Sequence, residues 1–384
     1  MLPGESKSAL LALTSGALLL PAYQHAHADA PPEFTNLGLV YGQYREDDIT
    51  SDKSAGGDSK RMEVDIAHFF LFAPVAEDWS LALDVTWEDM SGASPWFVGQ
   101  SASGDPKVIM SAASIRDTRT SVSVTTRYYY DRGNAGLNYT RSSEDDYESD
   151  AIAFDASFNS ADGMQTYSAA VSVSKDTLEP TQGPTPTSTL KDNKDTRSAW
   201  VGVTQIVSKR AIVRFGLSYT YSDGFLTDPY KANDQRPDSR KEWAVDAGYR
   251  HFLTGLNGAV KVDYRFFDDD WGINSHTIDI AWHQNLGQDL QLIPFLRYYT
   301  QAEAEFFSNQ VDGTERFFSD DYRLSAFGAI SMGLRVRAGI GDWSVNLSGE
   351  RYRTDEGWGV YGGEESPALV DSWRVSFGLD YTFK

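Results

Sequence analysis

The sequence predicts an all-β fold, a transmembrane antiparallel up-and-down β-barrel of about sixteen strands with short periplasmic turns and long extracellular loops. Three observations support this class. Apolar and polar residues alternate with a period of two in many segments, and long and short connections alternate between those segments. No stretch of the chain after its N-terminal apolar run holds the ~18 consecutive apolar residues that a membrane helix needs.

The last segment shows the alternation most clearly. From Trp373 to Phe383 every second residue is apolar or aromatic, and the residues between them are small, polar or charged. Every backbone N–H and C=O in lipid must be paired within the protein, so a sheet there has to close, with its apolar face turned outward. The alternative is a soluble sandwich or propeller with the apolar face inward, but it leaves the alternating loop lengths unexplained, and no blade-length repeat appears.

About sixteen segments share this pattern, and each is long enough for a tilted spanning strand, which needs roughly 9–11 residues. They lie near residues 34–44, 61–73, 79–89, 119–131, 135–143, 149–159, 164–175, 196–208, 211–222, 241–252, 259–268, 274–285, 289–302, 321–338, 343–353 and 371–383. Every second connection is tight and rich in Gly, Asn and Asp. Since the strand number is even, both termini are predicted to lie in the periplasm.

Aromatic residues near the strand ends fit two girdles at the membrane interfaces. They are Trp79, Trp87, Tyr128, Tyr130, Trp200, Trp243, Trp282, Trp343, Trp373 and Tyr381.

The N-terminus predicts a secretory signal peptide over residues 1–28. Lys7 precedes an apolar run from Ala9 to Leu20, and Ala26 and Ala28 give the small-x-small pattern of a cleavage site. The run is too short for a membrane anchor, which is the alternative. The mature chain, 29–384, is then a single barrel domain in the cell outer membrane of a bacterium.

Composition limits the partners. The net charge of −21 argues against nucleic acid, and the absence of cysteine excludes a disulfide scaffold and a thiolate metal site. We expect outer-membrane lipid and lipopolysaccharide as surroundings, whereas the oligomeric state is not marked in the sequence.

The end of the chain resembles the C-terminal assembly signature of outer-membrane barrels. The matching positions are Ser376, Gly378, Tyr381 and Phe383, and Lys384 departs from the pattern by following the aromatic residue. The resemblance implies insertion by the barrel-assembly machinery. A plain edge strand is the alternative.

The longest inter-strand region contains "SGASP" and "MSAASIRDTRT", both within 89–120. These motifs resemble an uncharacterised family of bacterial outer-membrane barrels, domain of unknown function 3570. The resemblance implies a porin-like barrel in the outer membrane and no settled activity.

Loop 90–118 is a candidate constriction of the lumen. It is rich in Ser, Ala and Gly, which allow close packing, and it carries charged residues at Asp105, Lys107, Arg116, Asp117 and Arg119. The alternatives are an exposed loop and a hairpin that extends the flanking strands beyond the membrane.

Charged residues at lumen-facing positions are candidates for selectivity. The alternation places Glu63, Asp65, Asp84 and Glu88 on early strands and Arg297, Arg335, Arg337 and Arg374 on late strands. Opposed acidic and basic walls would tune a water-filled pore, and a barrel of this size normally leaves one. The alternative is a cross-strand lattice of salt bridges in a packed lumen.

Acidic clusters in the loops or at their edges offer the oxygen ligands that Ca²⁺ and Mg²⁺ prefer. They lie at Glu46, Asp47 and Asp48, at Glu144, Asp145, Asp146 and Glu148, at Asp268, Asp269 and Asp270, and at Asp320 and Asp321. None has the spacing of a calcium loop, so solvated charge is expected, with no metal and no cofactor.

No catalytic residue is predicted. The sequence has no G-x-S-x-G, phosphate loop or H-E-x-x-H, and the neighbouring Ser275 and His276 point to opposite faces of their strand. The sequence therefore favours a passive, porin-like channel for small polar solutes over an enzyme. The alternatives are a non-conducting scaffold or receptor with a plugged lumen and a lipid-modifying enzyme.

Overall fold

A computed structural model describes residues 30–56, 59–93, 95–110, 115–180 and 191–384. Sixteen antiparallel strands form a closed barrel, in which consecutive strands are neighbours and the last strand pairs with the first. The predicted signal peptide, 1–28, lies outside the described residues. In the described part of the chain, no helix has the length and apolar character to cross a membrane.

The barrel strands agree closely with the predicted segments. They are β1 (Thr35–Glu46), β3 (Glu63–Ala76), β4 (Trp79–Gly92), β7 (Ile115–Tyr130), β8 (Gly133–Ser143), β9 (Tyr147–Asn159), β10 (Gln165–Leu178), β11 (Asp192–Ser208), β12 (Ala211–Gly224), β14 (Ser239–Leu253), β15 (Gly258–Asp269), β16 (Asn274–Leu286), β17 (Leu290–Gln301), β19 (Phe327–Ile340), β20 (Trp343–Asp355) and β21 (Ser372–Phe383). One strand starts late: β19 was predicted from 321, but Tyr322–Leu324 form a 3₁₀ turn, η2, after the capping residue Asp321.

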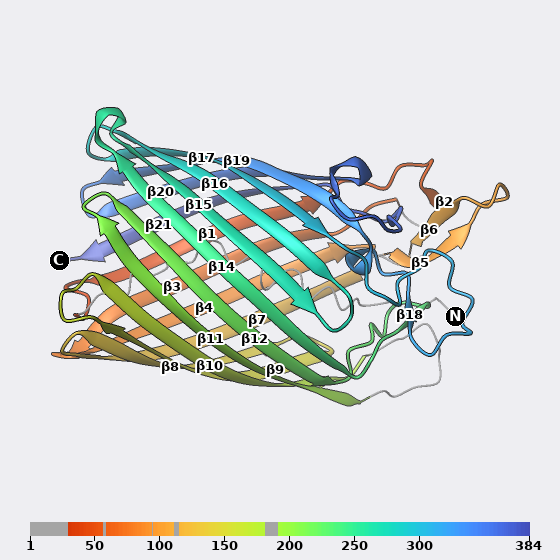
Figure 1. The fold of residues 1–384 in the computed structure, drawn as a ribbon, viewed down its shortest axis with the longest axis horizontal. Helices are drawn as coiled ribbons and strands as arrows, with labels where there is room; N and C mark the ends of the chain where they lie inside the picture. Colours follow the sequence, from red (N-terminus) through yellow and green to blue (C-terminus); the bar gives the residue numbers. More distant parts are fainter. Residues whose placement is uncertain (1–29, 57–58, 94, 111–114, 181–190) are drawn as a thin grey trace.

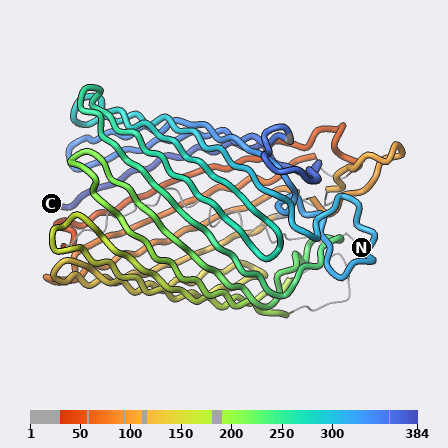
Figure 2. Tube along the Cα trace, in the orientation of Figure 1, coloured from red at the N-terminus to blue at the C-terminus, as the bar shows by residue number. Residues whose placement is uncertain are grey.

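The two ends of the barrel differ, as the connection lengths predict. At one end, the turn end, short connections join the strands, and the left-handed residues Arg132 and Asn257 lie in two of these turns. At the other, the loop end, the connections are mostly long (Figure 1). The tube in Figure 2 shows the steep, shared tilt of the strands between these ends.

The outer surface of the barrel is apolar. Leu39 on β1 and Phe215 on β12 are each 55% exposed, and similarly exposed apolar side chains occur on the other barrel strands. An apolar belt around a closed sheet is stable in lipid and not in water, so the barrel is a transmembrane one. Among the predicted girdle residues, Trp200 is an exception, because it lines the lumen.

The described loops at the loop end carry their own small structures. β2 (Ser54–Gly56), β5 (Pro95–Gln100) and β6 (Pro106–Met110) form a three-stranded sheet, and β13 (Asp234–Gln235) pairs with β18 (Phe318–Ser319). A second 3₁₀ turn, η3 (Glu356–Trp358), follows β20, and η1 (Thr254–Leu256) lies at the turn end. Two apolar clusters are buried among these loops and strand ends, one around Val108 and Met110 and one around Trp271 and Phe307. The loops therefore have a packed core of their own.

Candidate functional site: the lumen and its loop cap

The half of the lumen near the turn end contains a cavity of about 1230 Å³. Charged side chains on its wall come from strands all around the barrel, and they are Asp84, Arg127, Arg214, Arg250, Asp263, Arg335, Arg337 and Asp380. Residues 30–33, which precede β1, also border it. The cavity is large enough for water and small polar solutes, and its wall suits them.

Most charges in the lumen are paired across neighbouring strands. Arg127 donates two hydrogen bonds to Asp155, at 2.8 and 2.9 Å. Further cross-strand pairs are Arg265–Asp246, Arg297–Asp279, Arg374–Glu350 and His68–Asp84. Asp263 pairs with Lys261 on its own strand, β15, and with Arg214 of β12 at 3.7 Å. The lattice of cross-strand salt bridges therefore accounts for most of the charge that the sequence placed in the lumen.

Arg335 and Arg337, like Arg250 on β14, lie outside these pairs. Both lie on β19 and face the cavity, and neither has an ion pair among the described residues. The Arg335 guanidinium lies 5.8 Å from the centre of the Phe295 ring, a cation–π contact that leaves its charge uncompensated. These two residues give one wall of the cavity a positive potential.

The loop end of the barrel is covered by a cap, which we define as β2, the β5–β6 hairpin, loop 225–238 and loops 302–326 and 356–371. Loop 225–238, the bridging loop, crosses the mouth. On one side the Tyr230 hydroxyl donates to Asp146 between β8 and β9, and on the other Arg323 donates to Asp228 at 2.8 Å from the loop after β17. In the barrel, β8 and β9 lie on one side of the β12–β14 pair from which the bridging loop comes, and β17 and β19 lie on the other side.

The centre of the cap is a buried cluster of charges around Asp321. This carboxylate is fully buried and accepts hydrogen bonds from Arg236, at 2.7 Å, and from Arg323, while Lys231 lies 3.8 Å away. Burial alone would raise the pKa of Asp321, but Arg323, Lys231 and Arg236 together hold that pKa well below its ordinary value. Asp321 is thus the common anion for three cations from two loops.

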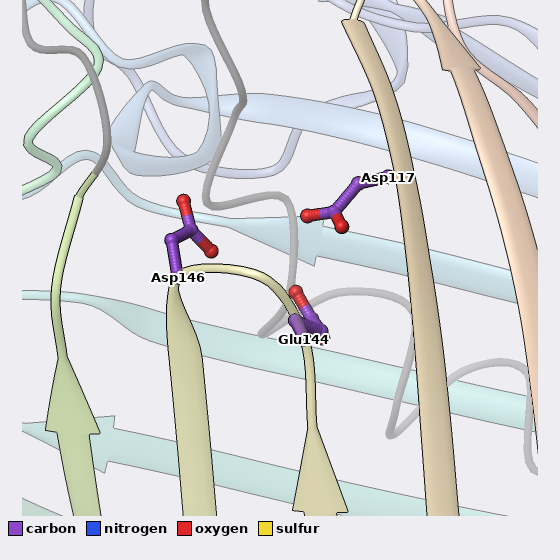
Figure 3. A group of neighbouring side chains, drawn as sticks. All are labelled: Asp117, Glu144 and Asp146. Carbon is purple, nitrogen blue, oxygen red and sulfur yellow. The ribbon is translucent and has the colours of Figure 1, made fainter.

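A second buried cluster lies where β7 approaches the connection between β8 and β9. Asp117, Glu144 and Asp146 are all buried, and one oxygen of each lies within 4.8 Å of the others (Figure 3). Burial raises the pKa of Glu144 to about 9, and the nearby Asp117 carboxylate contributes to the rise. The expectation of solvated charge is wrong for Glu144 and Asp146, and also for the buried Glu46, Asp269, Asp320 and Asp321.

The comparisons with known proteins place this barrel in a family. Residues 10–373 match the family described as "Protein of unknown function (DUF3570)". The chain belongs to this family. No curated protein matches the chain.

Solved structures share the fold of this DUF3570 barrel at low sequence identity. CdiB from Acinetobacter baumannii matches with a TM-score of 0.54 and 10% identity, over 92% of this chain but only 60% of the CdiB chain. A bacterial polysaccharide outer membrane secretin matches with a TM-score of 0.49 and 8% identity, over 91% of this chain and 99% of that one. At 10% identity the likeness to CdiB shows the fold alone.

Two predicted lumen residues of the DUF3570 barrel face outward. In the strand pairing, Glu63 and Asp65 of β3 lie opposite Arg45 and Gln43 on the outer face of β1. Both carboxylates form ion pairs with Arg45. The inward positions of this part of β3 are apolar: Val64 and Ile66 are buried in a cluster with Met62 and Met90. The strand begins at the loop end, where the outer surface leaves the hydrocarbon, so charges are tolerated there.

Loop 90–118 does not descend as a whole into the lumen. Its β5–β6 hairpin stands beyond the loop end beside β2 (Figure 1), so the exposed Asp105 and the half-buried Lys107 do not narrow the membrane-level lumen. Arg116 faces outward and lies 3.7 Å from Asp89. Asp117 and Arg119 do face the lumen, where Arg119 pairs with the buried Glu88 at 2.6 Å.

Ser275 and His276, the serine and histidine of a possible lipid-modifying enzyme, lie on opposite faces of β16. His276 lies on the outer face, and its two ring nitrogens each lie 2.7 Å from a tyrosine hydroxyl, of Tyr264 and Tyr361. Ser275 is buried on the other side of β16. The pair does not form, as the alternation predicts.

The residues of the assembly signature divide between the two faces of β21. Ser376 and Gly378 line the cavity. Tyr381 and Phe383 face outward, and their rings meet edge to face at a centroid distance of 4.7 Å. Lys384 forms an ion pair with Asp342 in the adjacent tight turn. Recognition by the assembly machinery stays a prediction.

The cap is expected to be more stable at pH 5 than at pH 7, in part because of Asp320. Burial raises the pKa of this carboxyl to about 6, against the lowering effect of the Val98 N–H, of Lys231 and of Asn233. A folded-state pKa above the unfolded value means that the folded cap binds the extra proton, so stability falls as pH rises from about 4 to 6. Asp320 contributes about 1 kcal/mol between pH 7 and 5.

The measurement is the rate of proteolysis of the cap at the two pH values, compared with Asp320→Asn. Because other buried carboxyls titrate in the same direction, the result to compare is the difference between the two proteins. A pH dependence that is identical in Asp320→Asn would contradict the assignment to Asp320.

Proposed function

We propose that this DUF3570 member is an outer-membrane channel for passive diffusion of small polar solutes, with its loop end outside the cell and its turn end in the periplasm. The observation that carries the proposal is the cavity of about 1230 Å³ in the turn-end half of the lumen, bordered by charged and polar side chains. A lumen filled by packed apolar side chains would not be bordered by charged and polar groups. The cap, rather than loop 90–118 alone, is the restricted entrance.

Planar-bilayer recording tests this proposal directly. Purified protein is expected to give stepwise increases in current, with small unitary conductance because the cap covers the entrance. Heat-denatured protein at the same detergent concentration is the control. A natively folded protein that never conducts, across a wide range of voltages, would overturn the channel proposal.

Neutralising Arg335 and Arg337 on the cavity wall is expected to change the ion preference of the channel. The double variant Arg335→Gln and Arg337→Gln removes two charges that face the cavity and have no ion pair among the described residues. Such charges raise the local concentration of anions in a narrow polar space. We therefore expect the reversal potential in a salt gradient to move toward cation preference by several millivolts, on the order of a twofold change in permeability ratio.

The matched control for that double variant is Arg141→Gln. Arg141 pairs with Glu148 and Asp150 on the outer face of the barrel, away from any permeation path. An equal shift in both proteins, or none in the double variant, would show that Arg335 and Arg337 do not face the path of ions.

One observation favours a second candidate function, a receptor or scaffold that binds a partner through the loop end. The cap has buried apolar clusters and a buried charge cluster, which is more order than a simple pore entrance requires. Folded protein that is silent in bilayers but captures a cell-envelope component through the cap would support this function. A lipid-modifying enzyme gains no support from His276, whose ring nitrogens both contact tyrosine hydroxyls.

A further inference from the structure

Three carboxylates from two separate parts of the chain converge at the loop end. Asp117 projects from β7 toward the lumen, while Glu144 and Asp146 flank the short connection from β8 to β9 (Figure 3). One oxygen of each lies within 4.8 Å of the others, and all three residues are buried. Carboxylates at such distances repel one another strongly when water is excluded.

The surroundings of Glu144 give an independent sign of a ligand. Its side chain has 0% exposure, and neither carboxylate oxygen has a hydrogen-bond partner among the described residues. Among the described residues the cation that pairs with Glu144 is Arg119, which lies at 4.0 Å and is paired more closely with Glu88, at 2.6 Å. A carboxylate buried in this way is costly unless a cation binds it.

We propose that Asp117, Glu144 and Asp146 bind one divalent cation, with Ca²⁺ as the preferred ion. Oxygen atoms that share a Ca²⁺ ion lie about 2.3–2.6 Å from it, so pairs of ligands up to about 5 Å apart fit around one ion. Glu144 brings two carboxylate oxygens without hydrogen-bond partners among the described residues to this group, and a cation shared with Asp117 and Asp146 would satisfy them.

The donor set favours Ca²⁺ over other common metals. All three ligands are carboxylates, without the imidazole or thiolate that Zn²⁺ sites use. Two of them lie in a short connection between strands, which permits the irregular, high-coordination shells of Ca²⁺ better than the near-ideal octahedron that Mg²⁺ demands.

A bound ion would also tie the cap to the barrel wall. Asp146 accepts a hydrogen bond from Tyr230 in the bridging loop, and its carbonyl accepts one from the N–H of Glu179 at the end of β10. An ion held by Asp117 and Asp146 therefore links β7, the β8–β9 connection and the bridging loop. The site itself is independent of whether the protein conducts.

The test uses full-length mature protein refolded in detergent without lipopolysaccharide, since lipopolysaccharide binds cations itself. After chelation, calorimetric titration with CaCl₂ is expected to show one ion per chain, and Ca²⁺ should raise the thermal unfolding midpoint. Glu144→Gln is expected to weaken binding at least tenfold and to abolish that rise, although its apo form should fold at least as well as wild type because Gln keeps the size of a buried carboxyl that is costly to ionise. Asp117→Asn should also weaken binding.

The matched control is Asp145→Asn. Asp145 is exposed in the same connection, so this change is expected to leave binding unchanged. Absence of Ca²⁺ binding to folded wild type, or equal binding by wild type, Glu144→Gln and Asp117→Asn, would overturn the site. Binding of MgCl₂ in preference to CaCl₂ would overturn the choice of ion. Conductance is not a readout here, so failure of this site and failure of the channel proposal are distinguishable.

Discussion

Replacing Asp321 with alanine is expected to release the cap while leaving the barrel intact. Arg236, Arg323 and Lys231 share this buried carboxylate, and without it Arg236 keeps Asp234 and Arg323 keeps Asp228, while Lys231 loses its ion-pair partner. Removing one partner from a buried ion cluster typically costs about 3–5 kcal/mol. That loss equals the contribution of several cap hydrogen bonds, because each contributes only about 1 kcal/mol.

Two measurements detect the release of the cap. Trypsin is expected to cut Asp321→Ala after Lys231, which is buried in the closed cap, at least tenfold faster than wild type, whereas Arg236 precedes Pro237 and is not a trypsin site. If the protein conducts, its unitary conductance should rise as well. The barrel should still show the faster migration of unheated sample in detergent gels, because its strand pairing does not involve the cap.

The control for this release is Asp312→Ala in the same loop. Asp312 is exposed and only accepts hydrogen bonds from Thr314, so its loss should change neither proteolysis nor conductance. A cap that resists trypsin equally in wild type and Asp321→Ala would show that the charge cluster does not hold it closed.

The barrel could be predicted from the sequence because its two determinants are local. Alternation along each segment assigns one face to lipid, as from Trp373 to Phe383, and the tight turns set the pairing of neighbours. The prediction was wrong where alternation is ambiguous. On β3 both faces carry apolar residues, and only the packing of Val64 and Ile66 under the cap shows that Glu63 and Asp65 point outward.

The cap could not be predicted because its contacts are not local. Asp228 meets Arg323, 95 positions away, and Val98 meets Asp320, 222 positions away, through single residues in irregular loops. No periodicity marks such pairs. Glu144 and Asp146 can be identified as an acidic cluster from the sequence. Their burial, which makes them a candidate cation site, depends on β7 and on Tyr230 from a distant loop.

Closure of the barrel through β21 gives the second large expected effect. Phe377 lies in the middle of β21, paired with Tyr41 on β1 and with Leu347 on β20. Phe377→Pro removes a backbone donor and displaces the chain, which leaves a carbonyl unpaired within the hydrocarbon at a cost of several kcal/mol. We expect no heat-modifiable barrel, either after refolding in detergent or in cells, whereas Phe377→Leu should fold normally because it keeps the N–H and an apolar side chain.

The same strand separates closure from recognition by an assembly machinery. Phe383→Ala removes a ring that packs on Tyr381 at the end of the strand but no ladder hydrogen bond. If the C-terminal signature acts as a recognition signal, Phe383→Ala should refold in detergent like wild type and yet be depleted from the outer membrane of cells. Depletion in both settings would assign Phe383 to barrel stability, and depletion in neither would leave the terminal aromatic without a role in assembly.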